Sequence, residues 1–355
     1  MSDGQNISAS FIRATGVILA SSLDQMSEGC RHYVADNFNI CFKHGFRVKS
    51  VAMSVTENTI SSTDSFRSAR IGLGNGWRGR VCRALRDGNA VSAQDWRKAL
   101  CGLEKLLSEP KKHLKVDGST TVAVYDLKVG DKTLSIAVKT HIRQAGVVNF
   151  LRGLLRDKSL RNFRTAAKLC ENGIPAAYPL AAITQKRGLI TAKTIFITEY
   201  IENSTDLYTF AAKNISQTDP GDKSSRQIKK QLALQIATIV AGLHRANLWH
   251  RDAKTGNFLV TATPAGGIEV MLVDMDGIKP YLAATEKRRY FAFTKLGSVL
   301  MWHKGINLTD YLRSVRIYCN LSKVDKNKGQ RIFRRLCRSA IALRLLTFAA
   351  SAMKK

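Results

Sequence analysis

The sequence predicts a two-lobed α+β protein, and three observations lead to that fold class. The chain has 355 residues, which is longer than a typical single domain. Alternating, β-rich sequence is found at 111–141, with one further short strand at 194–198. From residue 227 onward the spacing is mainly helical, interrupted by two short apolar runs at 257–262 and 269–273. Strands in one part and helices in the other favour two lobes that are built differently.

The first predicted segment, residues 1–105, is a basic and mainly helical N-terminal extension. A Ser/Thr-rich break at 54–65 and a glycine-rich break at 72–79 interrupt its helical spacing. The sequence GNGWRGRV at 74–81 fits the pattern of a phosphate-cradling glycine loop. Such a loop must be followed at once by its strand, whereas helical sequence is predicted here. We therefore interpret 72–79 as a helix-breaking turn.

The second segment, residues 106–201, is predicted to hold a small sheet and one helix. Strands at 120–125 and 133–138 flank a Gly130-Asp131 turn. A strand at 114–116 precedes them, and residues 117–119 form the turn between the two. Helical spacing follows at 145–171, before the strand at 194–198. The third segment, residues 202–355, is predicted to be a helical lobe with a small hairpin and a basic C-terminal helix.

The strongest functional signal is the sequence HRDAKTGN at 250–257, between a predicted helix at 231–247 and an apolar strand. It matches the kinase catalytic loop, in which the Asp accepts the proton of the attacking hydroxyl and the Asn holds Mg²⁺. We therefore predict Asp252 as the catalytic base and Asn257 as a metal ligand. Lys254 is predicted to neutralise charge on the transferring phosphoryl group.

A second acidic motif lies 22 residues beyond the catalytic loop. The strand at 269–273 ends in DMDG at 274–277, an imperfect match to the Asp-Phe-Gly motif that binds Mg²⁺ in kinases. An acid occupies the place of the glycine. We predict Asp274 as the second ligand, because carboxylate and amide oxygens suit Mg²⁺ rather than zinc.

The remaining matches concern ATP. Lys139 ends the apolar strand IAVK and is predicted to anchor the phosphates. The turn at Gly118 and Ser119 is the predicted phosphate-facing loop. The sequence FITEYI at 196–201 resembles a kinase hinge, where main-chain groups of three residues would bond the adenine. These residues are Glu199, Tyr200 and Ile201. All matches follow the kinase order, so the sequence predicts a two-lobed protein-kinase-like fold that uses ATP and Mg²⁺.

From about residue 111 to about residue 322 the chain resembles the lipopolysaccharide core kinase family. Its members are heptose and Kdo kinases, which phosphorylate inner-core sugars from ATP. The resemblance implies Asp252 as the base, Lys139 as the phosphate anchor and Asp274 as the metal ligand, with a sugar hydroxyl as acceptor. The motifs that carry it are GDK at 130–132, LRNF at 160–163, NGIP at 172–175, FITE at 196–199, HRD at 250–252, KRRY at 287–290 and GINLT at 305–309.

Two departures from kinase patterns bear on the chemistry. The family usually carries a Glu in the helix after the anchoring lysine, and Asn162 occupies that position here. Either Glu171 substitutes for it, or the ion pair of Lys139 is missing. Between Asp274 and the predicted helix at 288–302 there is no long activation segment and no Ala-Pro-Glu sequence. Protein kinases dock peptides on that segment, so its absence favours a small or glycan acceptor.

The chain is strongly basic. Its 56 Lys and Arg residues exceed its 27 Asp and Glu residues, which gives a formal net charge of +29. Such an excess indicates an anionic partner. Residues 323–355 hold ten basic groups and one acid, and four arginines recur there at helical spacing. These are Arg331, Arg334, Arg335 and Arg338. This helix could contact an anionic membrane or a phosphorylated glycolipid, or it could be the solvated last helix of the lobe.

Two further features concern compartment. The seven cysteines are scattered without a CxxC pair, which predicts reduced thiols rather than a disulfide framework. No secretory signal is recognisable. We therefore expect a cytoplasmic protein that associates peripherally with the inner face of the cell membrane.

Two rival functions remain open at this stage. One is a protein or small-molecule kinase of the same fold. The other is a non-catalytic nucleotide or nucleic-acid binder, which the charge would suit. Nucleic acid is the less favoured partner, because Tyr311, Tyr318 and Phe333 do not interleave with the arginines as stacking aromatics would.

Overall fold

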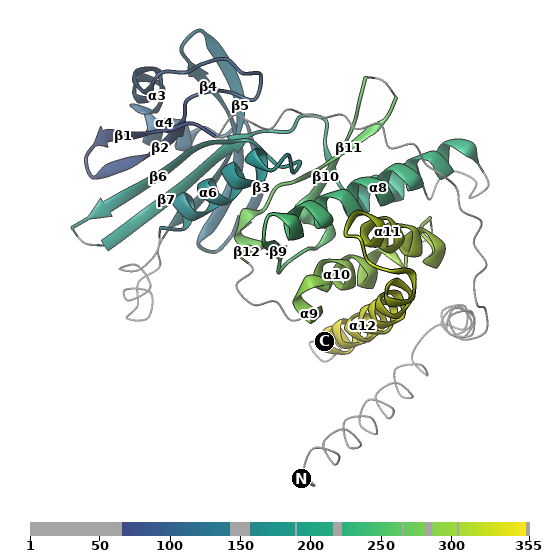
Figure 1. Cartoon of the computed structure of the whole chain (residues 1–355). Helices are drawn as coiled ribbons and strands as arrows, with labels where there is room; N and C mark the ends of the chain where they lie inside the picture. The colour runs from purple at the N-terminus through teal and green to yellow at the C-terminus, as the bar shows by residue number, and fades with distance from the viewer. Residues whose placement is uncertain are drawn as a thin grey trace.

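The computed structural model describes residues 66–142, 157–188, 190–215, 222–264, 266–280, 286–303 and 305–352. Two lobes of different construction lie next to each other, one rich in strands and one mainly helical (Figure 1). The predicted two-lobed α+β fold is therefore confirmed.

The strand-rich lobe is built on one antiparallel sheet of seven strands in the order β1-β2-β6-β7-β5-β4-β3. The strands predicted at 114–116, 120–125 and 133–138 are all present and are longer than predicted. The turn at Gly130, whose φ is +59°, joins two of them as expected. The seven strands are β1 (Ser68–Gly74), β2 (Trp77–Cys82), β3 (Lys112–Asp117), β4 (Thr120–Val129), β5 (Lys132–Ile142), β6 (Pro179–Arg187) and β7 (Ile190–Glu199).

The prediction of a mainly helical segment up to residue 105 is wrong for residues 66–105, the part that the structure describes. β1 and β2 form a hairpin that turns at Asn75 and Gly76, both of which have positive φ. Residues 72–79 are therefore mostly strand, not a helix-breaking turn. Because β2 pairs with β6, the sheet of the first lobe begins well before residue 106. In the sheet order, β6 and β7 separate this hairpin from β5, the strand of Lys139.

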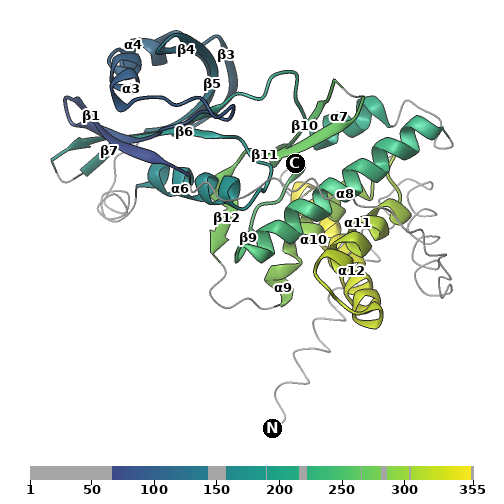
Figure 2. The ribbon, with the colours of Figure 1, turned by 45° about the horizontal axis from the view of Figure 1, so that its top comes forward.

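Helices cover both faces of the sheet. α3 (Ala93–Leu100) and α4 (Leu103–Ser108) lie over one face, while α6 (Lys158–Glu171) packs on the other (Figure 2). The fully buried Trp96 anchors α3, and its indole Nε1 donates to the carbonyl of Cys82 at 2.9 Å. α6 starts at Asp157, whose side chain accepts from the amide of Leu160 and so caps the helix.

The second lobe is mainly helical. Long α8 packs against α11, and α10 packs against α12, around a core that includes Phe258, Phe293 and Tyr318. The predicted hairpin at 257–273 is present as β10 and β11. In chain order, the elements of this lobe are β8 (Thr205–Asp206), α7 (Leu207–Asn214), α8 (Lys223–Arg245), β9 (Leu248–His250), η1 (Thr255–Asn257), β10 (Phe258–Ala262), β11 (Ile268–Leu272), η2 (Met275–Gly277), β12 (Ile278–Pro280), α9 (Glu286–Arg289), α10 (Phe291–Leu300), α11 (Leu308–Leu321) and α12 (Lys326–Ala352).

Two general properties bear on the sequence predictions. The five cysteines in the described part of the chain are all free. None of the described helices combines the length and the apolar character that crossing a bilayer requires.

Candidate active site

Strand pairing brings the two predicted catalytic loops together. β9 pairs with β12, and this places His250 opposite Ile278. The amide of Arg251 donates to the carbonyl of Gly277 at 2.7 Å, and the amide of Val273 donates to the carbonyl of Asn257 at 3.2 Å. The loop at 251–257 and the loop at 274–277 are thus hydrogen-bonded to each other at both ends.

His250 supports the backbone of Asp252. Its ring is buried, and Nδ1 accepts a hydrogen bond from the Asp252 amide at 3.2 Å. Burial lowers the pKa of His250 to about 4, so the ring is neutral near pH 7. The ring packs tightly on Gly277, where a Cβ atom would lie 2.6 Å from His250 Cε1. Both the histidine and the glycine therefore hold the predicted base in place.

Asn257 is oriented by its own amide group. The side chain is buried, and Nδ2 donates to the carbonyl of Asp252 at 2.7 Å. This bond fixes the amide so that Oδ1 is the atom left for a ligand. In Asp274, Oδ1 contacts Lys139 and accepts from the amide of Asp276, which leaves Oδ2 for a ligand.

These two oxygens fit a magnesium ion that is bound together with a nucleotide. Mg²⁺ takes only one or two protein oxygens in such sites, and phosphates and water complete its octahedron. The described residues contain no group of three or more His, Cys, Asp or Glu side chains that could hold a metal by themselves. An amide oxygen and a carboxylate oxygen on adjacent loops agree with that kind of shared site.

Lys139 lies in a network of charges that the sequence did not reveal in full. Its Nζ contacts Asp274 Oδ1 at 2.9 Å and Asp276 Oδ2 at 2.7 Å. Asp276 Oδ1 in turn contacts an Arg161 nitrogen from α6 at 3.2 Å. Although burial by itself would raise the pKa of Asp276, the Lys139 ammonium outweighs it and holds that pKa well below its usual range. The carboxylate is therefore ionised.

Asp276 was missed as a site residue. It stands at the position of the glycine in Asp-Phe-Gly, and we read the mismatch only as a flaw in the motif. The signal was available in the DMDG sequence, where two carboxylates are spaced to face one lysine.

Among the described residues no α6 carboxylate pairs with Lys139, and Glu171 does not serve as its partner. Glu171 lies at the C-terminal end of α6, where Oε1 accepts from the amide of Phe66 at 3.1 Å. Asn162, at the expected position, is 1% exposed, and its side-chain atoms have no hydrogen-bond partner among the described residues. Lys139 nevertheless has two carboxylates, both from the loop after β11.

The turn at Gly118 and Ser119 lies beside the end of β5. Gly118 has a φ of +47°, and the carbonyl of Ser119 accepts from the amide of Ile142 at 2.9 Å. Val122 pairs directly with Lys139, so the two side chains share a face of the sheet. The turn and the lysine are thus three residues apart along neighbouring strands.

The predicted hinge follows β7. The side chain of Glu199 forms an ion pair with Arg86 at 2.6 Å, and Arg86 also donates to the carbonyl of Ala176. The amide of Tyr200 donates to the carbonyl of Ser135 at 3.0 Å. Within the described part of the chain the amide of Ile201 makes no hydrogen bond, so it is the hinge donor left for a ligand.

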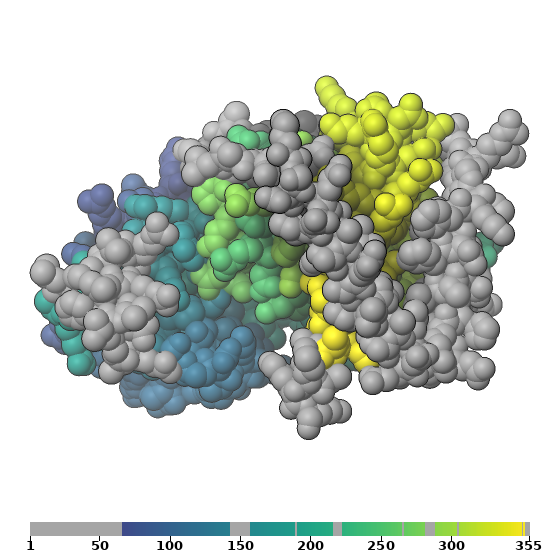
Figure 3. All heavy atoms as spheres, turned by 90° about the horizontal axis from the view of Figure 1, so that it is seen from below, coloured from purple at the N-terminus to yellow at the C-terminus, as the bar shows by residue number. Residues whose placement is uncertain are grey.

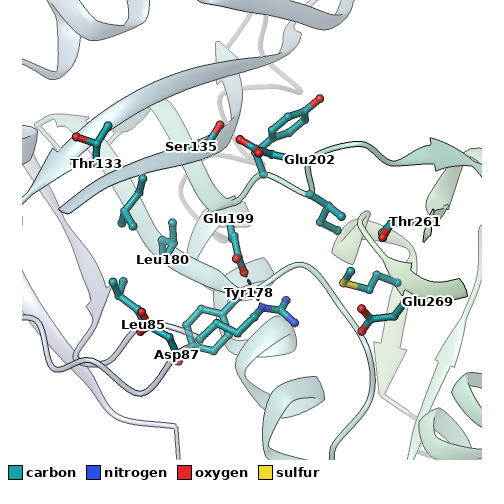
Figure 4. A pocket seen from close by; sticks show the side chains of 15 residues that line it. Leu85, Asp87, Thr133, Ser135, Tyr178, Leu180, Glu199, Glu202, Thr261 and Glu269 are labelled. Atoms are coloured by element: carbon teal, nitrogen blue, oxygen red, sulfur yellow. Dashed lines mark hydrogen bonds and ion pairs between the residues drawn. The ribbon is translucent and has the colours of Figure 1, made fainter. Parts of the chain in front are cut away.

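The same hinge residues line a cavity of about 640 Å³ (Figure 4). Tyr178 and Met271 line it from either side, and the Arg86–Glu199 pair lies within it. Of the predicted site residues only Glu199, Tyr200 and Ile201 belong to its wall. The cavity is therefore distinct from the cluster around Lys139.

Lys254 lies close to Asp252, with 3.4 Å between Nζ and Oδ2. Both side chains are about half exposed. Strand pairing and hydrogen bonds therefore link Asp252, Lys254, Asn257 and Asp274, and Lys139 reaches this group from the sheet.

Comparison with known proteins agrees with the kinase-like fold and the sequence resemblance described above. Residues 147–318 match a family model described as the Lipopolysaccharide kinase (Kdo/WaaP) family. A solved structure of WaaP in complex with acyl carrier protein is similar with a TM-score of 0.50 and 17% identity, over 71% of this chain and 98% of that chain. A Toxoplasma gondii specific rhoptry antigen kinase domain gives a TM-score of 0.38 and 14% identity, over 69% and 83% of the two chains. No curated protein matches the sequence.

The family match covers the loops that carry Asp252 and Asp274, and the likeness to WaaP shows the fold. The resemblance noted from the sequence motifs is thereby confirmed. Over residues 147–318 the chain is similar to the lipopolysaccharide kinase (Kdo/WaaP) family, and the protein is a phosphotransferase with a kinase-like fold.

Proposed function

We propose that the protein transfers the γ-phosphoryl group of ATP to a sugar hydroxyl, on heptose or Kdo, of a lipopolysaccharide inner core. The observation that carries this proposal is the pairing of the two loops that hold Asp252, Asn257 and Asp274 beside Lys139. The family match supports a lipopolysaccharide core as the acceptor. The absence of an Ala-Pro-Glu segment favours a glycan over a peptide.

Asp252 is the group that takes the proton of the acceptor hydroxyl. The hydroxyl oxygen then forms a bond to the γ-phosphorus, and the bond to the β,γ-bridging oxygen breaks, so that ADP leaves with that electron pair. The neutral His250 ring holds the Asp252 backbone, which keeps the carboxylate aimed at the acceptor. Lys254, 3.4 Å from Asp252, places a positive charge where negative charge builds up on the phosphoryl oxygens.

Asn257 Oδ1 and Asp274 Oδ2 would hold the nucleotide-bound Mg²⁺. That ion neutralises phosphate charge during transfer. Lys139 is positioned for the α- and β-phosphates, with the Gly118-Ser119 turn next to it. The free amide of Ile201 and the main chain of Glu199 would bond the adenine at the hinge.

We also propose that the protein works at an anionic membrane surface on the cytoplasmic side, where a glycolipid acceptor would be presented. The support is α12. Its apolar residues Ile332, Leu336 and Ala340 are buried against the lobe, and its four arginines are exposed on the other side. Toward its end the helix exposes Leu346 and Phe348 as well. Figure 3 shows part of α12, in yellow, at the surface.

The function is tested by transfer of radiolabel from γ-labelled ATP to purified lipopolysaccharide core and, separately, to a peptide library. We expect Mg²⁺-dependent labelling of the core, and a loss of about 10²- to 10⁴-fold in kcat for Asp252→Ala. Asp126→Asn is the matched control, because this exposed carboxylate pairs with Lys111 outside the site. Label that goes to peptide alone would overturn the glycan acceptor. A wild-type protein without any ATP turnover would overturn the proposed catalysis.

A further inference from the structure

The phosphate-anchoring lysine of a kinase needs a carboxylate partner. In protein kinases that partner is a Glu on the helix after the lysine strand, and movement of the helix makes or breaks the pair. In this chain the helix is α6, and the uncharged Asn162 occupies the position of the Glu. Asn162 is buried, and the one acidic residue within α6, Glu171, contacts the amide of Phe66 instead of Lys139.

Asp276 supplies the missing carboxylate from a different element. Its Oδ2 lies 2.7 Å from Lys139 Nζ, which is closer than the 2.9 Å contact of Asp274 Oδ1. Both carboxylates belong to the loop after β11. Lys139 is therefore held by the metal loop itself.

The two carboxylates are not equivalent. Both oxygens of Asp276 are engaged by cations, Oδ2 by Lys139 and Oδ1 by Arg161, and His141 Nε2 lies 3.8 Å from Oδ2. A metal ion at Asp276 would compete with these cations for the carboxylate charge. Asp274 keeps Oδ2 for the metal. The geometry thus separates a ligand, Asp274, from a structural counter-charge, Asp276.

We propose that Asp276 is the positioning residue of Lys139 and replaces the helix carboxylate of other kinases. The inference rests on the proposed ATP-dependent transfer. Its consequence is a different connection between the lobes, in which Arg161 ties α6 to the loop through Asp276. The lysine stays in place without a carboxylate partner on α6.

The role of Asn162 follows from the same arrangement. A Glu at 162 would bring a second carboxylate toward Asp276, because α6 packs against η2, the short helix that holds Asp276. Two carboxylates so close together repel each other. Asp276 and an α6 glutamate are therefore alternatives, and only one of them fits.

Because Asp276 and a glutamate at 162 exclude each other, three variants test the proposal. They are Asp276→Asn, Asn162→Glu and the double variant. Asp276→Asn removes a charge-assisted bond to Lys139, so we expect the KM for ATP to rise about tenfold to a hundredfold. Asn162→Glu alone should also weaken ATP binding, by repulsion. The double variant should recover most of the wild-type affinity, because the new glutamate can then pair with Lys139. A residue with only a structural role would not show this reversal.

The readouts are ATP·Mg²⁺ binding, measured by titration calorimetry, and the KM and kcat for ATP turnover. Asp310→Asn is the control, because Asp310 is a largely buried carboxylate that Arg313 and Lys229 contact on α11 and α8. It should lower stability without changing the affinity for ATP. Thermal unfolding of every variant separates misfolding from loss of binding.

The outcomes separate a failure of the proposed function from a failure of the proposed role of Asp276. A wild-type protein that binds no ATP·Mg²⁺ contradicts the proposed function. A wild-type protein that binds ATP while Asp276→Asn binds it equally well contradicts only the role of Asp276. Additive losses in a folded double variant contradict it too.

Discussion

Several side chains of the site use one polar atom to hold a loop and keep the other for a ligand. Asn257 donates from Nδ2 to the Asp252 carbonyl, and Asp274 accepts through Oδ1. In both cases one side-chain oxygen, Oδ1 of Asn257 and Oδ2 of Asp274, is left for a metal. Such double use removes the freedom of the side chain to rotate, so the site is arranged before a nucleotide arrives.

Gly277 is expected to be intolerant of any side chain. In Gly277→Ala the new Cβ would meet His250 Cε1 at 2.6 Å and would lie 3.4 Å from Asp252 Cβ. Displacement of Asp252 by about 1 Å should cost on the order of a hundredfold in kcat. Gly256→Ala is the matched control in the same site, because a Cβ there meets nothing within 4 Å. Measured turnover that is equal in the two variants would show that the packing of His250 does not matter.

Stability should decrease as the pH falls below about 6.5. Burial lowers the pKa of His250 to about 4, and that of His244 likewise to about 4, whereas an unfolded histidine titrates near 6.5. The unfolded state therefore binds more protons between these values, and this contribution is complete above pH 6.5 and is lost toward pH 4. Each histidine should add a slope of up to about 1.4 kcal/mol per pH unit.

Urea unfolding at several pH values between 4.5 and 7.5 measures that slope. His250→Gln should reduce it by the share of one proton, and the exposed His113→Gln should leave it unchanged. An identical slope in wild type and His250→Gln would refute the assignment of this proton uptake to His250.

The sequence pattern identified the two loops of the candidate site but not all the partners of their side chains. The order and spacing of Lys139, Asp252, Asn257 and Asp274 identified two loops that strand pairing does bring together. Asp276 was missed because its proposed role arises only when α6 has no glutamate at position 162. A carboxylate partner on a distant element can be recognised only when the geometry shows that Asp276 contacts Lys139.

At the scale of elements, the β1–β2 hairpin also depends on tertiary contacts that the sequence alone does not reveal. Four glycines and several arginines between 70 and 80 give it the composition of a loop. Two of the glycines are needed because the backbone approaches β6 closely. A Cβ at Gly76 or Gly79 would lie 2.3 Å from a β6 carbonyl oxygen, that of Lys186 or Ala182. Local propensity could not anticipate this tertiary requirement.

The strands β4 and β5, and the buried apolar part of β7 at 194–198, were predicted from the sequence, whereas β6 was not. β4 and β5 alternate around a glycine turn, so the sequence identified both. The first six residues of β6 are all buried, and no alternation marks them. Such a strand resembles a short buried helix when only the sequence is read.

Gly79→Ala tests the attachment of the hairpin to the sheet. The new Cβ would collide with the Ala182 carbonyl, which cannot move without breaking the β2–β6 pairing. We expect a loss of about 1–3 kcal/mol in the free energy of unfolding. Gly72→Ala lies in the same hairpin with nothing within 4 Å of the new Cβ, so it should change stability by about 0.5 kcal/mol or less. Urea denaturation compares the two, and similar losses would contradict a specific close approach.

At the scale of the whole molecule, charge and fold act together. The net charge of +29 suits a protein that, as proposed, accepts two anionic substrates, a nucleotide and a phosphorylated glycolipid. The described part of the chain includes most of α12, whose buried side is packed against α10 and α11. The structure therefore agrees with one of the two alternatives drawn from the sequence, and membrane contact by this helix stays a proposal. It is the last helix of the lobe, and its arginines remain exposed.

Binding to anionic vesicles tests whether those arginines contact a membrane. Each basic side chain near an anionic surface contributes about 1 kcal/mol. The double variant Arg331→Gln/Arg334→Gln should thus bind vesicles of phosphatidylglycerol and phosphatidylethanolamine about thirtyfold more weakly than wild type at low salt. The difference should shrink as salt rises, because the Debye length falls from about 10 Å at 0.1 M to about 3 Å at 1 M.

The matched control moves the same loss of charge to another exposed helix end. Lys223→Gln/Arg226→Gln on α8 removes two positive charges and leaves α12 intact. If net charge alone drives association, the two double variants will weaken vesicle binding equally, and the role of α12 is refuted. If α12 is the contact surface, Leu346→Ser/Phe348→Ser should add a loss that salt does not alter, because burial of apolar side chains is not screened. Flotation of the four proteins at two salt concentrations separates these outcomes.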